Sequence, residues 1–182
     1  MLKFADPDLW WDTVERHLGG PRLPRLLLAL AITGAFGIAA ASEIGIRYFN
    51  ADWNFAFGYS VQRDRSWGPF FALWGGTVIA LITQGLVGAA LMPVYSKPRL
   101  WMRAVSVAII GSIPMYVAGL ALVLLPGVLL FAFAFLLSCG WWTSGGRRLL
   151  GLGYGEAPEH VVVALTISAG LMLLLSACLM RS

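Results

Sequence analysis

Side chains that could do chemistry are few in this chain, and most of them lie in apolar surroundings. At depth, the long apolar stretches contain hydroxyls and one amide but no acid, base or histidine. These polar residues are Thr77, Thr83, Gln84, Ser106, Ser112, Ser138, Thr166 and Ser168. Such groups form hydrogen bonds between membrane helices, whereas catalysis needs a nucleophile beside a base, a carboxylate pair or a metal cluster. The sequence therefore predicts no catalytic residues, no metal ligands and no enzyme activity.

One group of polar residues could form a site for a solute. Pro114 falls midway along an apolar stretch, where a proline kinks a helix and frees backbone carbonyls. Together with Gln84 and Ser112 it defines a candidate midplane site for a small apolar or zwitterionic solute. A broken helix can mark such a site, but a single break without a matching repeat more often shapes the helix.

Two further patterns could indicate cofactors. His17 and His160 both map to one membrane interface, whereas paired haem ligands normally lie within the spans of a bundle. The segment Gly151–Gly155 has the glycines of a phosphate-binding loop, but it lacks the strand that precedes such a loop. The segment Glu156–Glu159 is expected to cap the helix that follows. The sequence therefore predicts no cofactor.

The elements that would position these groups are membrane helices. Between Arg103 and Arg147 the chain runs 43 residues without Asp, Glu, Lys or Arg. As helix this run would measure about 64 Å, roughly twice the hydrocarbon thickness of a bilayer. It must cross, turn and cross back, and Pro126-Gly127 suits the turn of this helical hairpin. The sequence predicts one all-α integral membrane domain over residues 1–182. Its five predicted spans are about 26–46, 70–94, 104–124, 127–142 and 161–180.

The distribution of cations predicts the orientation. Five spans place nine Lys and Arg residues on the side of the N-terminus and four on the other side. Positive residues favour the cytoplasmic side, so we expect the N-terminus in the cytoplasm and the C-terminus and first loop outside. The net charge of +4 then reflects topology and attraction to anionic lipid, and no nucleic-acid partner is expected.

Two aromatic segments are candidates for contact with lipid or a partner. Residues 7–18 predict a short amphipathic helix that lies along the membrane interface, with Trp10, Trp11, Val14 and Leu18 on one face. The first loop, about 43–66, and the residue that follows it carry the aromatic candidates Tyr48, Phe49, Trp53 and Trp67. These aromatics suit the interfacial belt. Simple anchoring and contact with a partner protein or lipid both remain open.

Small residues predict close helix packing. The first predicted span has Ala29, Thr33, Gly37 and Ala41 on one ridge and Ala31, Ala35 and Ala39 on another. Small residues at this spacing let helix backbones approach each other. Thr33, Ala35, Gly37 and Ala41 are therefore candidate contacts with a partner. The glycines Gly75, Gly76, Gly85 and Gly88 offer similar flat patches on the second span.

These segments resemble a known family. The segment Ser112–Leu120 (S-I-P-M-Y-V-A-G-L), followed by Leu125-Pro126-Gly127, resembles the "S-x-P-x-W-L-A-G-I … P" signature of the Yip family of five-span membrane proteins. Trp11–Val14 is similar to the family's "T-W-x-x-I" segment before the first span, although Trp10 replaces the usual threonine. Gly151-Leu152 and Pro158-Glu159 are similar to its "G-L-P … P-E" connection. The resemblance implies five spans and offers no active site that could be mapped onto this chain.

The expected function follows from these features together. Eukaryotic Yip proteins interact with Rab-type GTPases in vesicle traffic, and we do not expect that role here because the N-terminus is short. The excess of Arg over Lys and the compact body favour a bacterial inner-membrane protein. We expect a non-catalytic accessory or scaffolding subunit that contacts lipids and other membrane subunits, or copies of itself. The alternative is a small-solute carrier or channel with a site near the Pro114 kink.

Overall fold

The structure is a computed structural model that describes residues 7–48, 68–92, 99–121 and 128–179, and these residues form helices with short turns. The α-helices are α1 (Pro7–His17), α2 (Arg22–Tyr48), α4 (Gly68–Ala90), α5 (Leu100–Gly111), α6 (Ile113–Ala121), α7 (Val128–Gly145) and α8 (Glu156–Leu179). A π-helix, Gly146–Leu150, follows α7 directly. The all-α prediction is therefore confirmed.

Among the described helices, three stretches are long and apolar enough to cross a membrane. They are Arg22–Ala40, Phe70–Ala90 and Leu100–Gly119, and the last of these runs through α5 and α6. Helices α7 and α8 occupy the positions of the fourth and fifth predicted spans, but five crossings stay a prediction. The turn at Pro126-Gly127 lies outside the described residues.

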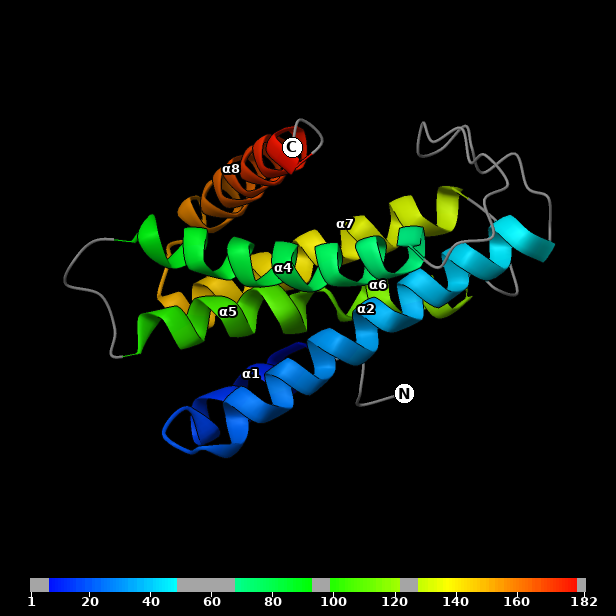
Figure 1. Cartoon of the computed structure of the whole chain (residues 1–182). Helices are drawn as coiled ribbons and strands as arrows, with labels where there is room; N and C mark the ends of the chain where they lie inside the picture. The colour runs from blue at the N-terminus through cyan, green and yellow to red at the C-terminus, as the bar shows by residue number, and fades with distance from the viewer. Residues whose placement is uncertain (1–6, 49–67, 93–98, 122–127, 180–182) are drawn as a thin grey trace.

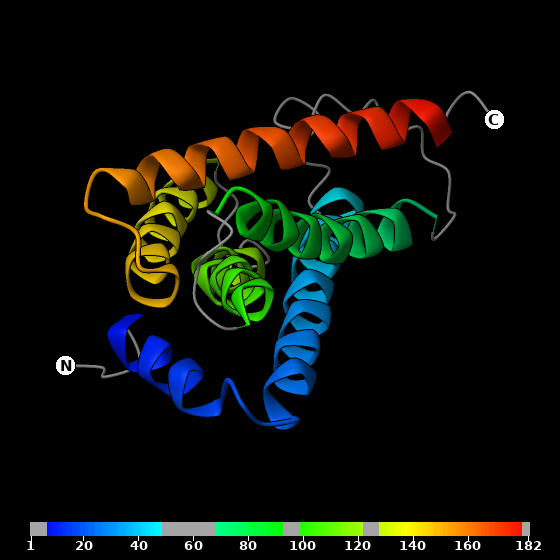
Figure 2. The same ribbon diagram turned by 90° about the vertical axis from the view of Figure 1, so that its left-hand side faces the viewer.

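The helices pass back and forth between two ends of a bundle (Figure 1). Helix α1, the start of α2, the end of α4, the start of α5, the π-helix and the start of α8 gather at one end, which we call the α1 end. Helix α5 occupies the centre and contacts α2, α4 and α7. Figure 2 shows α8 lying across the outside of the bundle, over α4 and α7.

The central position of α5 follows from its sequence. Seven consecutive residues, from Ser106 to Ser112, are buried, and the only polar members are the two serines. Each serine hydroxyl bonds to a carbonyl of its own helix, Ser106 Oγ to Met102 O at 2.7 Å and Ser112 Oγ to Ala108 O at 2.8 Å. Burying these hydroxyls therefore leaves neither of them unpaired.

Glycines let the helices approach each other closely. A Cβ placed on Gly85 of α4 would lie 2.6 Å from Val105 Cα of α5, and one on Gly34 of α2 would lie 2.6 Å from the Tyr116 ring of α6. Gly119 of α6 meets Ile38 of α2 in the same way, at 2.7 Å. Real Cβ atoms do not pack this tightly, so these positions require the absence of a side chain.

The helix boundaries near the α1 end differ from the predicted spans, and the two largest differences concern α7 and α8. The fourth predicted span ends at residue 142, whereas helical structure continues through α7 and the π-helix to Leu150. Burial of Leu149 and Leu150 in the bundle extends the helix past the arginine pair. Helix α8 begins at Glu156, ahead of the predicted residue 161, because Glu156 Oε2 accepts a hydrogen bond from Gly153 N–H at 2.9 Å and caps the helix.

Candidate functional site

The predicted midplane site lies at a break in the central helix. Helix α5 ends at Gly111 and α6 begins at Ile113, the residue before Pro114. The Ser112 N–H donates to Ile109 O at 3.3 Å, so it leaves Ala108 O, its partner in a regular helix, available. Two side chains donate to Ala108 O instead, Ser112 Oγ at 2.8 Å and Trp142 Nε1 at 3.2 Å. The Ala108 carbonyl is therefore bound by protein, and the Ser112 N–H also approaches Ile110 O, the carbonyl that Pro114 leaves without its helical donor.

Trp142 of α7 also fills the space beside the break. Its side chain is buried, and a Cβ on Gly111 would lie 2.0 Å from its Cδ1 atom. The Phe135 ring stands edge-on to the Trp142 ring with centroids 6.0 Å apart. Sequence reasoning did not single out Trp142, because its partners on α5 lie more than 30 positions away.

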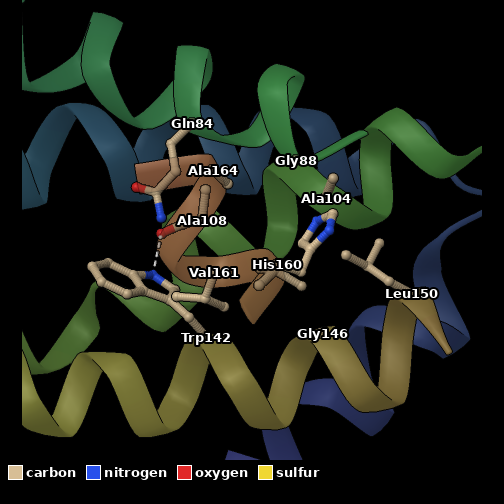
Figure 3. A pocket seen from close by; sticks show the side chains of 11 residues that line it. Gln84, Gly88, Ala104, Ala108, Trp142, Gly146, Leu150, His160, Val161 and Ala164 are labelled. Atoms are coloured by element: carbon tan, nitrogen blue, oxygen red, sulfur yellow. Dashed lines mark hydrogen bonds between the residues drawn. The ribbon is translucent and has the colours of Figure 1, made fainter. Parts of the chain in front are cut away.

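The structure separates the three predicted midplane residues. Ser112 is buried at the break and Pro114 is half-buried in the first turn of α6. Gln84 instead lines a different place, a cavity of about 30 Å³ near the α1 end (Figure 3). Neither Ser112 nor Pro114 lines that cavity.

The cavity lies where α4, α5, α7, the π-helix and α8 meet. Its lining residues are Gln84, Gly88, Ala104, Val107, Ala108, Trp142, Gly146, Leu150, His160, Val161 and Ala164. His160 Nε2 is buried, with no hydrogen-bond partner in the described part of the chain. Burial lowers the pKa of His160, and an interaction of hydrogen-bond type with the backbone of Gly88 opposes this with a smaller effect, although its geometry falls short of a regular hydrogen bond. The sequence placed His160 at the interface but gave no sign of a cavity beside it.

The N-terminal helix α1 docks on the bundle by its tryptophan face. Trp11 is completely buried, and a Cβ on Gly145 of α7 would lie 2.9 Å from its ring. The Trp11 ring also stands edge-on to Trp141, with centroids 6.4 Å apart. Val14 and Leu18 are buried on the same face, and Trp10 is half-buried. The predicted amphipathic face is present, but it packs on protein, and Trp11 is not on the surface.

Polar contacts accompany this docking. Arg148 pairs with Asp12, and Arg103 Nη1 lies 3.4 Å from Glu15 Oε1 and donates to Leu149 O at 3.1 Å. Arg99 donates to the carbonyl of Leu18. Exposed ion pairs of this kind contribute about 0–1 kcal/mol each. Burial of the Trp11 side chain is therefore the larger contribution to the docking of α1.

The glycine-rich segment after the π-helix is a capping loop. Gly151 has a φ of 80°, a left-handed conformation that glycine adopts easily. The carboxylate of Glu156 occupies the Gly153 N–H, and the Arg147 guanidinium lies 3.4 Å from the centre of the exposed Tyr154 ring. An acidic side chain thus takes the N–H that a phosphate would need.

The predicted contact residues of α2 divide into buried and exposed ones. Ala35 and Gly37 are buried within the chain, along with Ala31 and Ala39. Thr33 is exposed and its Oγ1 donates to Ala29 O at 2.7 Å. The side chains of Ala41 and Tyr48 and the residues Phe49, Trp53 and Trp67 lie outside the described parts of the structure.

Large apolar side chains are exposed on several helices. On α4, Leu73 and Ile79 are 41% and 53% exposed, and Gly75 and Gly76 between them have no described atom within 4 Å of an added Cβ. Helix α8 has a face of the same kind. An added Cβ on Gly170 would meet no described atom within 4 Å, and Leu171 and Leu174 beside it are exposed. These faces need lipid or another apolar surface to cover them.

An aromatic cluster joins the exposed faces of α2 and α4. Phe36 stands edge-on to Phe70 and to Trp74, with centroid distances of 5.5 and 5.8 Å. Trp74 Nε1 donates to Ile32 O at 3.0 Å, which fixes the indole on α2. This cluster was not predicted, because its members lie on two helices and follow no single period.

Comparison of the chain with models of protein families, with curated proteins and with solved structures gives no match.

Proposed function

We propose that this chain is a non-catalytic, multi-pass membrane protein that acts by contact, as an accessory or scaffolding subunit of an inner-membrane complex. The observation that carries the proposal is the open glycine face of α4. Gly76 lies one turn from the exposed residues Leu73 and Ile79, and a Cβ there would touch no described atom. Glycine on a membrane helix surface favours the approach of another helix over contact with lipid chains.

The contrast within α4 strengthens this proposal. Gly85, nine residues further on, is buried against the backbone of Val105, so it serves packing within the chain. No described residue packs closely against Gly75 or Gly76. We infer that a helix of another subunit, or of a second copy of this chain, packs over Gly76.

The proposed orientation places the α1 end in the cytoplasm. Arg16, Arg22, Arg25, Arg99, Arg103, Arg147 and Arg148 belong to segments at that end, whereas Arg47 belongs to the opposite end of α2. Positive residues on the cytoplasmic side are the general rule for inner-membrane proteins. The C-terminus of a five-span chain would then lie outside, as would its first loop.

We also retain the Yip-type assignment as a proposal. Its support is the match of residues 112–120 together with the role of that segment, where Ser112 and Pro114 lie at a helix break and Gly119 contacts Ile38 of α2. The carrier alternative has no such support. At the break beside Pro114, protein groups bind the carbonyl of Ala108, and Trp142 covers Gly111.

Substitution of Gly76 tests the proposed interface. We expect Gly76→Leu to keep its helix content and thermal stability but to lose its partner during purification in mild detergent, because leucine would block helix approach. Val162→Leu on α8, an exposed position that is not a glycine, is the control and should keep the partner. Retention of the partner by Gly76→Leu would eliminate this face as the interface.

A further inference from the structure

The joint between α8 and the rest of the bundle contains a small, mainly apolar cavity bordered by two polar side chains. Its volume is about 30 Å³. The space exists because the walls carry short side chains at positions facing α8, among them Gly88 on α4, Ala104 and Ala108 on α5, and Gly146 in the π-helix. Figure 3 shows these walls around the imidazole of His160. A cavity of this size has room for about two water molecules.

Two polar side chains border the cavity. His160 Nε2 is buried without a hydrogen-bond partner in the described residues. Gln84 also lines it, as a half-buried side chain with a polar amide. A buried polar atom that stays unpaired destabilises a protein, and native structures satisfy almost all such atoms with protein or ordered water.

The end of α4 adds an acceptor to the same wall. Leu91 N–H bonds to Val87 O at 3.0 Å and Met92 N–H bonds to Ala89 O at 3.2 Å. The carbonyl of Gly88, which lies between those two acceptors, receives neither N–H group. Gly88 also faces the imidazole, because a Cβ on it would lie 3.6 Å from His160 Nε2. The wall therefore offers the two to four polar partners that an ordered water requires.

We propose that this cavity is a water-binding site, in which ordered water bonds to His160 Nε2 and to the Gln84 amide and so joins α8 to α4. Helix α8 contacts the bundle through α4, α7 and the π-helix. Water at this joint pairs the imidazole of α8 with the Gln84 amide of α4, beside the Gly88 backbone that already interacts with the imidazole. The interior polar residues Gln84 and His160 thus stabilise the packing of the last helix.

A high-resolution structure of the full chain in lipid nanodiscs gives the direct test. We expect density for water within hydrogen-bonding distance of both His160 Nε2 and the Gln84 amide. An empty cavity, or a direct bond between Gln84 and His160, would overturn the proposal.

A variant cycle in detergent gives an independent test that needs no density. Gln84→Met and His160→Leu should each lower the melting temperature, because each leaves water and the other polar group with fewer partners. The double variant should melt higher than the additive expectation, because it removes both polar groups and the need for water. Thr166→Val, on the exposed face of α8, should leave the melting temperature unchanged. Strictly additive losses in the double variant would contradict a shared water site.

Discussion

Replacing Gly111 by alanine tests the packing of the central helix. A Cβ at this position would lie 2.0 Å from Trp142 Cδ1 and 2.6 Å from Nε1. Trp142 has little freedom to move away, because it is buried, its Nε1 bonds to Ala108 O, and the Phe135 ring stands against it. Overpacking of this kind costs about 1–3 kcal/mol, and loss of the hydrogen bond adds about 0.5–1.5 kcal/mol. We therefore expect Gly111→Ala to lower the free energy of unfolding by about 2–4 kcal/mol.

The assay is reversible unfolding in mixed detergent micelles, followed by circular dichroism and by tryptophan fluorescence. Gly140→Ala on α7 is the matched control, because a Cβ there meets no described atom, and its effect should stay within about 0.5 kcal/mol. The second variant Gly111→Ala with Trp142→Phe should recover part of the loss, since a smaller ring gives the new methyl group room. Equal stability of Gly111→Ala and Gly140→Ala would refute the packing of Trp142 on α5.

Three further predictions concern the α1 end. Because burial lowers the pKa of His160, the unfolded chain binds more protons than the folded one below pH about 6.5. The melting temperature should therefore fall between pH 7.5 and 5, and it should fall less in His160→Asn. An equal change of melting temperature with pH in the two proteins would contradict this. Trp11→Ala should cost about 3–5 kcal/mol and make α1 sensitive to protease, while Leu9→Ala at an exposed position should do neither; protection of α1 in Trp11→Ala would contradict its docking by that ring. Glu156→Ala should cost about 1 kcal/mol through loss of the cap on α8, measured as a lower melting temperature, and an unchanged value would show that the bond to Gly153 contributes nothing.

The positions of the helices could be predicted because they depend on local composition. The charge-free run after Arg103 predicted helices on both sides of residues 125–127, and α5, α6 and α7 lie there. The break near Pro114 was predictable for the same reason, since proline removes a backbone donor wherever it occurs. The arrangement of five crossings and their orientation were inferred from charge alone, and they stay predictions.

The partners of each helix face could not be predicted, because one pattern serves several environments. The tryptophan face of residues 7–18 has the same period whether it meets lipid or protein, and the structure buries Trp11 against Gly145. Likewise, the small residues of α2 could serve an external or an internal contact, and Ala35 and Gly37 are buried inside the chain. Only the backbone arrangement decides between these uses.

The cavity at the α1 end could not be predicted from the sequence for a related reason. Gln84 and His160 lie 76 positions apart, and neither belongs to a motif with a recognisable spacing. They border one space because α4, α5, the π-helix and α8 all begin or end there. The π-helix itself had no signal, since Arg147 and Arg148 suggested a loop where the structure continues a helix.

The composition of the native assembly tests the central claim most directly. The full chain would be extracted from its own membrane with lipid retained, and the mass and stoichiometry of the particle would be measured by native mass spectrometry. A subunit that acts by contact should appear with a second membrane protein, or with copies of itself, in a fixed ratio, and Gly76→Leu should appear alone. A wild-type particle that contains one copy of this chain and only lipid would contradict the account.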